Sequence, residues 1–235
     1  MKRWLLALIL LVTVSPATAW WQSRDSNYNV NITSGGSPAT AFDPTTAFGQ
    51  LAFSNSNRTV AHTGGGNTND GVWTVSGTTT NQKVYVETSI VGVTFSLEMG
   101  FANDKTLVGN RFGGSNVSPT KGWLVSTGGA FACLDSVDNN TTLIPVFTTG
   151  DTVDYAFDTS VLKGWVRKNG GAWNASIGGT QDPATNQGGV ATTITGGGPY
   201  FFFYGADGGN GDQVTATFAS GSWARSAPAG FTQLQ

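Results

Sequence analysis

The sequence has little of the residue chemistry that most hydrolases and metalloproteins use. Among 235 residues there are one cysteine and one histidine, so an internal disulfide cannot form, and a nucleophile–base pair would have to use His62. No Gly-x-Ser-x-Gly elbow is present. Cys133 stands in an apolar segment, where an inert buried residue is expected. These absences argue against serine and cysteine hydrolases and against a zinc site.

Charge is also scarce, at 11% of the residues. Acidic side chains outnumber basic ones, 14 to 12, which argues against nucleic-acid binding and against electrostatic membrane binding, because both use basic patches. Glu87 and Glu98 are the only glutamates, and neither lies in a Glu-x-Asp-x-x-Glu glycosidase motif. Asp154 and Asp158 lie on one face of a predicted strand, roughly 13 Å apart at about 3.3 Å per residue, which is too far for a retaining glycosidase pair.

Only one long apolar run occurs, from Trp4 to Val14 after Lys2 and Arg3. With the small residues that end at Ala19, it predicts a secretory signal peptide over residues 1–19. The run is shorter than the roughly 20 apolar residues of a spanning helix, so no membrane insertion is expected after cleavage, although a retained anchor stays open. We expect a secreted, periplasmic or cell-surface protein, or a virion protein if a phage encodes it.

The mature chain is long enough for one large domain, and no linker divides it. We expect residues 20–72 to form an N-terminal arm with the first strands, and residues 73–235 to form the core of the same domain. Whether the segment that follows residue 19 is a mobile arm or an edge strand stays open.

Period-two alternation of apolar and polar residues predicts many strands and no helix competes with them. The clearest case runs from Val93 to Phe101, where every second residue is apolar and should face a core. Tyr200–Tyr204 is aromatic throughout, as in a strand covered on both faces. Strands are predicted at 72–76, 83–91, 93–101, 122–126, 130–134, 152–158, 162–168, 189–194, 199–205 and 213–219, and a short one at 59–62.

The most informative block runs from Gly150 to Asn174. Val153, Tyr155 and Phe157 alternate with polar or small residues, a turn follows Asp158, and a second strand places Val166 opposite Trp165 and Arg167. An Asn-Gly turn ends that strand. The pattern predicts an antiparallel meander.

This block resembles the centre of the SPRY domain family, in which a Gly-Asp start and an aromatic strand that ends in Asn-Gly follow one another. The segments Lys83–Ile90, Gly122-Trp123 and Val214–Phe218 resemble further pieces in the family's order, and the ending through Phe231 is similar to bacterial and phage members. The resemblance covers about residues 73–231. It implies an all-β fold, an antiparallel two-sheet β-sandwich of the concanavalin A-like jelly-roll type, with ligand-binding loops at one end. It does not name the ligand.

Aromatic and polar side chains around the meander suggest a surface that binds a glycan or a protein. The sequence does not decide between the two, and each tryptophan has burial in the core as its alternative. The candidate ligand-binding residues are Arg111, Trp123, Trp165, Arg167, Asn169, Trp173 and Asn174, with Trp173 the strongest surface candidate.

A glycine-rich segment near the C-terminus carries oxygen ligands of the kind that calcium prefers. Asp207, Asn210 and Asp212 are the candidates, and a plain glycine-rich hairpin is the alternative. No other cofactor is expected.

Three functions follow from this reading. The first is an exported, non-enzymatic recognition module, and the second is a structural or decoration protein of a phage virion or cell-surface assembly. A polysaccharide hydrolase or lyase is the third. A homo-oligomer is compatible with the first two.

Overall fold

The computed structural model describes residues 39–65, 69–103, 122–128, 141–192, 194, 197–207 and 209–235, although not the side chains of Asn69 and Asp207. Residues 37–235 form one compact unit. The segment before Trp73 supplies two strands and the first four residues of a third to this unit. No helix within the described part is long and apolar enough to cross a membrane.

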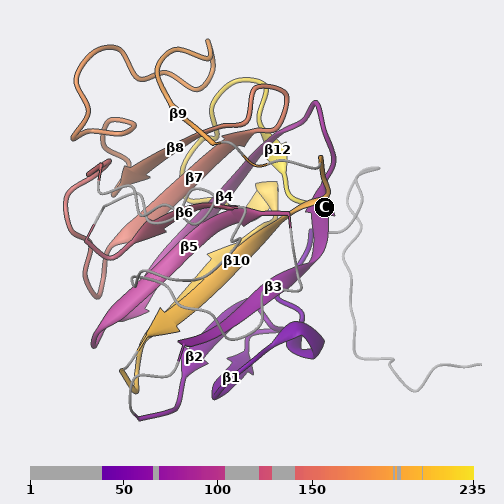
Figure 1. The fold of residues 1–235 in the computed structure, drawn as a ribbon, viewed down its shortest axis with the longest axis vertical. Coiled ribbons are helices and arrows are strands. Elements are labelled where there is room, and N and C mark those ends of the chain that lie inside the picture. The colour runs from indigo at the N-terminus through magenta and orange to yellow at the C-terminus, as the bar shows by residue number, and fades with distance from the viewer. Residues whose placement is uncertain are drawn as a thin grey trace, which may run out of the picture. The chain divides into compact units, whose positions relative to one another are not determined.

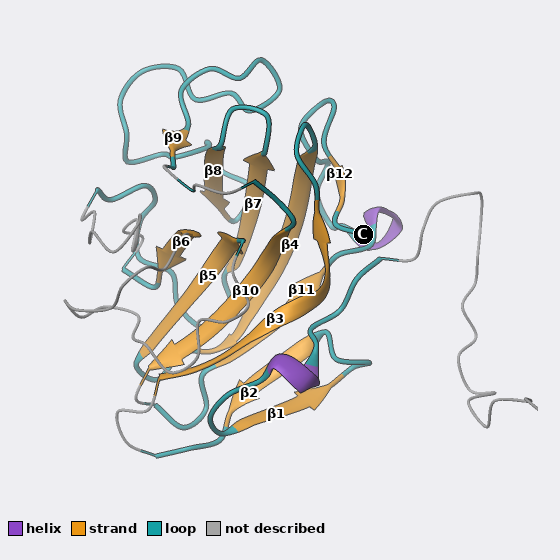
Figure 2. Ribbon diagram, turned by 45° about the vertical axis from the view of Figure 1, so that its right-hand side comes forward, coloured by secondary structure: helices purple, strands orange, loops and turns teal. Residues whose placement is uncertain are grey.

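The described residues form two sheets that pack face to face, as Figures 1 and 2 show. The larger sheet has the order β1-β2-β11-β4-β7-β8-β9, and β12 pairs with β4 in parallel. The smaller sheet has the order β3-β10-β5-β6. All other strand pairs are antiparallel. The chain is therefore the all-β sandwich that the sequence predicts.

The elements of the larger sheet are β1 (Leu51–Ser54), β2 (Thr59–His62), β4 (Lys83–Gly92), β7 (Thr152–Asp158), β8 (Lys163–Lys168), β9 (Val190–Ala191), β11 (Gln213–Thr217) and β12 (Thr232–Gln233). Those of the smaller sheet are β3 (Asn69–Thr78), β5 (Ser96–Ala102), β6 (Gly122–Ser126) and β10 (Tyr200–Asp207). Two short 3-10 helices are η1 (Pro44–Thr46) and η2 (Ser220–Ser222). Neither β1 nor β12 was expected, and the strand predicted at 130–134 lies outside the described residues.

The core lies between the sheets and is built largely of aromatic rings. Phe101 of β5 stacks on Phe157 of β7, with ring centroids 5.0 Å apart, and Phe202 of β10 meets Tyr155 edge to face at 5.3 Å. All four are fully buried, and each contributes about 1.5–3 kcal/mol by leaving water. The alternation that predicted these strands therefore marks the faces that form the core.

The first residues of the predicted strand 93–101 are an exception. Leu97, Met99 and Phe101 are fully buried as expected, but β5 begins only at Ser96 and Phe95 is 62% exposed. The prediction that Phe95 faces the core is wrong, because the chain turns between β4 and β5 at this point. Tyr200–Tyr204, in contrast, is covered on both faces as predicted, with only Phe201 partly exposed.

Candidate recognition surface

The outer face of the larger sheet carries ordered rows of side chains. In one row Tyr85 of β4 lies beside Ala156 of β7, which lies beside Trp165 of β8. In the next row Glu87, Asp154 and Arg167 follow across the same strands. The period of two along each strand brings these residues to one face, so the sequence placed Trp165 and Arg167 together correctly.

Arg167 is the centre of this outer face. Its Nε donates to Asp154 Oδ2 at 2.6 Å, and its Nη2 donates to Tyr85 Oη at 3.3 Å. The guanidinium also lies 4.5 Å from the ring centroid of Trp173, a cation–π distance. Burial alone would lower the pKa of Arg167, but the hydrogen bonds to Asp154 and Tyr85 raise it overall. The group therefore stays charged, and its donors are used inside the fold.

Residues 219–231 run over this face and cover it; we call this segment the C-terminal strap. The backbone N–H groups of Ala224 and Arg225 donate to the carboxylate of Glu87, each at 3.2 Å. Arg225 Nη1 lies 3.5 Å from Asp154 Oδ1. Trp223 packs against the Tyr85 ring, with centroids 4.7 Å apart. The two carboxylates of this row thus serve to hold the strap.

Several turns meet at one end of the sandwich. Here β4, β8 and β10 end while β5, β7 and β11 begin, and Figure 1 shows β10 ending at the lower left. We call the segments 93–95, 141–151, 169–175 and 209–212 together the loop end. Hydrogen bonds join neighbouring segments, since Thr149 Oγ1 accepts from the N–H of Val93 and Asn169 Nδ2 donates to Asp151 Oδ1.

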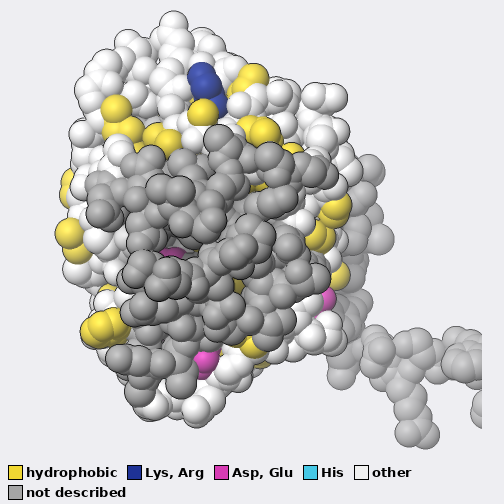
Figure 3. Space-filling model, in the orientation of Figure 1, with side chains coloured by type: hydrophobic (Ala, Val, Ile, Leu, Met, Phe, Trp, Pro, Cys, Tyr) yellow, Lys and Arg dark blue, Asp and Glu magenta, His cyan; other side chains and the backbone are white. Residues whose placement is uncertain are grey.

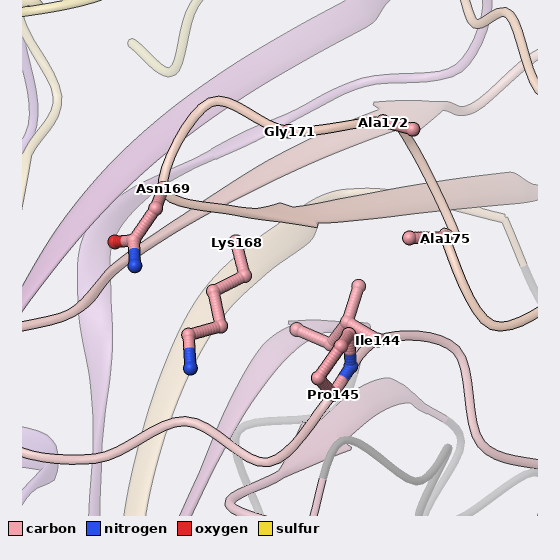
Figure 4. A pocket seen from close by; sticks show the side chains of 7 residues that line it. All are labelled: Ile144, Pro145, Lys168, Asn169, Gly171, Ala172 and Ala175. Carbon is pink, nitrogen blue, oxygen red and sulfur yellow. The ribbon is translucent and has the colours of Figure 1, made fainter.

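A small pocket opens at the loop end, with a volume of about 300 Å³. Figure 4 shows the 144–145 segment on one side and the 171–175 loop on the other, with Lys168 between them. The wall is mostly apolar and lacks bulky side chains. Its residues are Ile144, Pro145, Lys168, Asn169, Gly171, Ala172 and Ala175.

The polar groups at the pocket are already hydrogen-bonded to the protein. Lys168 Nζ lies 2.9 Å from Asp151 Oδ2 and donates to the carbonyl of Val146 at 2.8 Å. Asn169 accepts from the N–H of Thr152 and donates to Asp151 Oδ1, and Figure 4 shows its amide directed away from Ile144 and Pro145. These bonds fix the pocket's shape, so its free surface is apolar.

Exposed apolar side chains accompany the pocket. Phe95 is 62% exposed, Val146 58% and Val91 45%, and all three lie in or beside the loop end. On the face drawn in Figure 3 the described surface carries few charged groups, with apolar side chains scattered among polar ones. The mostly apolar wall of this pocket can accept an aliphatic or aromatic side chain, and the exposed apolar side chains lie at the same end of the sandwich.

Comparison with solved structures decides the fold family. The SPRY domain of human HERC1 superposes on 75% of this chain and 96% of its own length, with a TM-score of 0.51 and 16% identity. The chain has the SPRY fold. A second human SPRY domain matches 72% of this chain and 94% of its own, with a TM-score of 0.50 and 15% identity. No protein-family model and no curated protein matches the sequence.

Three of the predicted ligand-binding residues are buried inside the SPRY fold. Trp123 and Trp165 are fully buried; a Cβ on Gly164 would lie 2.2 Å from the Trp123 indole, so the ring packs directly on the β8 backbone. Asn174 is also buried, and its Oδ1 accepts from the N–H of Val166 at 2.9 Å. These three side chains do not reach the surface. Trp123 lies in the core between the sheets, Trp165 lies in the covered cluster on the outer face, and Asn174 is held against the β8 backbone.

The remaining candidates have different positions. Asn169 lines the pocket, while Trp173 is half-buried against Arg167 and Tyr85 on the strap side of the same loop. Arg111 lies outside the described residues. Sequence reasoning missed the 144–145 wall, because a single Ile-Pro pair between two predicted strands carries no periodic signal.

The predicted calcium ligands are not gathered into a site among the described side chains. Asn210 is exposed, whereas Asp212 is fully buried and its Oδ1 accepts from the Thr94 hydroxyl and from the N–H groups of Thr94 and Phe95. The Asp207 side chain lies outside the description. No group of three or more His, Cys, Asp or Glu residues able to hold a metal occurs in the described part. The Asp212 carboxylate therefore holds the turn at Thr94 and Phe95 through hydrogen bonds.

Proposed function

We propose that this chain is an exported, non-enzymatic recognition module that binds a protein segment through the loop end. The observation that carries the proposal is the apolar pocket beside Ala172, with Phe95 and Val146 exposed at the same end of a SPRY fold. One aliphatic or aromatic side chain of a partner would fill the pocket, while its neighbours would cover Phe95. Burial of such anchors is where interfaces gain most of their affinity.

The positions of the aromatic residues favour a protein over a glycan. A sugar-binding platform needs exposed rings, but Trp123 and Trp165 are fully buried. Trp173 is half-buried, and its ring carries the Arg167 guanidinium at 4.5 Å. At the loop end the exposed large apolar side chains are Phe95 and Val146, and the pocket wall beside them in this region is mostly apolar.

The carboxylates favour recognition over hydrolysis. Asp154 and Asp158 lie on one strand face, as the sequence predicted, but they are 0% and 1% exposed. Asp154 is paired with Arg167, and Asp158 Oδ2 lies 3.5 Å from Lys83 Nζ. An acid–base pair needs carboxyl groups that reach the substrate, and these two hold the sheet to its surroundings.

The test is selection of binders from a peptide display library on the immobilised protein, followed by titration of the selected peptide against matched variants. Ala172→Trp would fill the pocket, and we expect affinity to fall by at least about tenfold. Phe95→Ala would remove exposed ring area, with a loss of about three- to tenfold. The matched controls are Ala191→Trp and Val161→Ala, which change exposed residues at the other end of the sandwich.

The outcome separates the competing functions. Peptides whose affinity falls in both loop-end variants and not in the controls support the proposal. A glycan array run with the same protein, together with a reducing-sugar assay on any hit, tests carbohydrate binding and hydrolysis. Glycan binding without peptide binding would overturn the proposal. Self-association in sedimentation, unaffected by either loop-end variant, would move the assignment to an assembly protein.

A further inference from the structure

The single histidine of the chain is buried beneath the loop end, where no proposed contact with a partner uses it. His62 ends β2 and is 1% exposed. Its Nε2 lies 2.9 Å from Asp70 Oδ2, and its Nδ1 lies 2.6 Å from the carbonyl oxygen of Gly209. Asp70 is itself buried and also accepts from the N–H of Gln50.

Both ring nitrogens of His62 therefore face hydrogen-bond acceptors. A neutral imidazole has one N–H and one lone pair, whereas the imidazolium has two N–H groups. Only the imidazolium donates to the Asp70 carboxylate and to the Gly209 carbonyl at the same time. The carboxylate balances the buried charge and strengthens its hydrogen bond.

The contact with Gly209 connects His62 to the exposed surface. The backbone of His62 exchanges hydrogen bonds with the same turn, because its N–H donates to the Asp212 carbonyl and its carbonyl accepts from Gly211. The Asp212 carboxylate then accepts from the N–H groups of Thr94 and Phe95. The turn 209–212 thus lies between His62 on one side and the Phe95 turn on the other.

Packing makes this connection tight. A Cβ placed on Gly209 would lie 2.1 Å from Thr94 Oγ1 and 3.0 Å from the Phe95 Cβ. The two turns are therefore in direct contact, and a displacement of Gly209 moves the Phe95 turn with it.

We propose that the charge of His62 switches the loop end between a clamped form and a loosened form. In the neutral ring the single N–H goes to Asp70, because a carboxylate is the stronger acceptor. The Nδ1 lone pair then faces the Gly209 carbonyl and repels it, so the turn 209–212 loosens and Phe95 loses its fixed position. The clamped form is present while the imidazole is charged and is lost when the ring gives up its proton.

Three other titratable groups lie near His62 among the described side chains. They are Asp70 of β3, whose carboxylate contacts the imidazole, Tyr204 of β10, and Asp212 of the turn 209–212. Burial, followed by the charges of Asp212 and Asp70, raises the pKa of Tyr204, so its phenol stays protonated and donates to the Asp212 carbonyl.

The test uses tag-free protein, in which all imidazole NMR signals come from His62 because the sequence holds one histidine. Nitrogen shifts report whether both ring nitrogens carry protons. Amide exchange of Thr94 and Phe95, corrected for the intrinsic pH dependence, reports the clamp. We expect protection to fall about tenfold as His62 loses its proton, while the Thr152 amide, which donates to Asn169 at the same end, keeps its protection.

His62→Gln sharpens the result, because its protection at Thr94 and Phe95 should not change between pH 5 and 8. If that variant does not fold, the wild-type titration alone decides. The proposal is wrong if His62 carries one proton at pH 5, or if the protection of both amides is constant across its titration.

A second experiment measures peptide binding. It rests on the proposed function, and its result can be separated from that of the exchange experiment. The selected peptide should bind about tenfold more tightly at pH 5.5 than at pH 8, and with no such change to His62→Gln. A clamp that titrates while peptide affinity stays constant would show that Phe95 is not part of the recognition surface. Constant protection with peptide binding intact would overturn the switch and leave the recognition site.

Discussion

The outer face of the larger sheet and the loop end use their side chains in opposite ways. On the outer face, Asp154 and Trp165 are fully buried, and the strap covers the charges and rings. At the loop end, Phe95 and Val146 are more than half exposed beside an apolar pocket. The charged and aromatic residues of the outer face thus hold the fold together, whereas the loop end leaves large apolar side chains exposed.

Among the changes on the outer face, Arg167→Ala should lower the free energy of unfolding most. It removes the main partner of a fully buried carboxylate, which Arg225 approaches only to 3.5 Å, and breaking a buried ion pair costs about 3–5 kcal/mol of unfolding free energy. Urea denaturation measures the loss. Arg58→Ala is the control, since Arg58 donates to a backbone carbonyl in a turn, and should cost less than about 1 kcal/mol. A loss as small for Arg167→Ala would contradict the account.

Trp165 of β8 and Trp173 of the loop that follows it allow a comparison of a fully buried and a half-buried ring. Trp165→Ala empties a fully buried site and should cost about 3–5 kcal/mol. Trp173→Ala removes a half-buried ring and its contact with Arg167, which should cost about 1–2 kcal/mol. Thermal and urea unfolding give both values. Equal losses would mean that Trp173 belongs to the interior as fully as Trp165 does.

The sequence predicts the strands well and the exposure of their residues poorly. Alternation along 152–158 shows that Asp154 and Tyr155 point to opposite faces, and both the strand and the faces are as predicted. Alternation does not show what covers a face. The groups that cover Trp165 come from distant segments: its Nε1 donates to the Gln187 carbonyl, Gly189 packs on its indole, and Phe231 of the strap lies in the same buried cluster. The burial of Trp165 could therefore not be read from β8.

The candidate site is harder still to predict. The pocket brings Ile144 and Ala172 together across 28 positions of sequence. The pairing of β2 with β11 brings His62 within hydrogen-bond distance of Gly209. Loops meet according to strand order, which local patterns do not set. Asn169 is the one predicted ligand-binding residue that lines the pocket, because an Asn-Gly turn marks the end of β8.

The smallest expected effect tests the charged part of the loop end. Lys168 follows Arg167 directly in the sequence but pairs with Asp151 at the pocket. Burial would raise the pKa of Asp151, yet hydrogen bonds from Lys168, Thr148 and Asn169 lower it to about 2. A carboxyl group whose pKa is lower in the folded protein than in the unfolded chain stabilises the fold at pH values above its unfolded pKa of about 3.9. This stabilisation is lost as the pH falls toward 2.

Asp151→Asn should therefore remove part of the acid sensitivity of the protein. After discounting for solvent screening, the network contributes about 1 kcal/mol at pH 4.5 that is mostly absent at pH 2.5. Urea midpoints at the two pH values should differ less in Asp151→Asn than in the wild type, while Asp182→Asn, a change at another loop carboxylate, keeps the wild-type difference. An unchanged difference in Asp151→Asn would show that Lys168 is solvated at the pocket, and the contrast with its neighbour Arg167 would then be larger than the structure indicates.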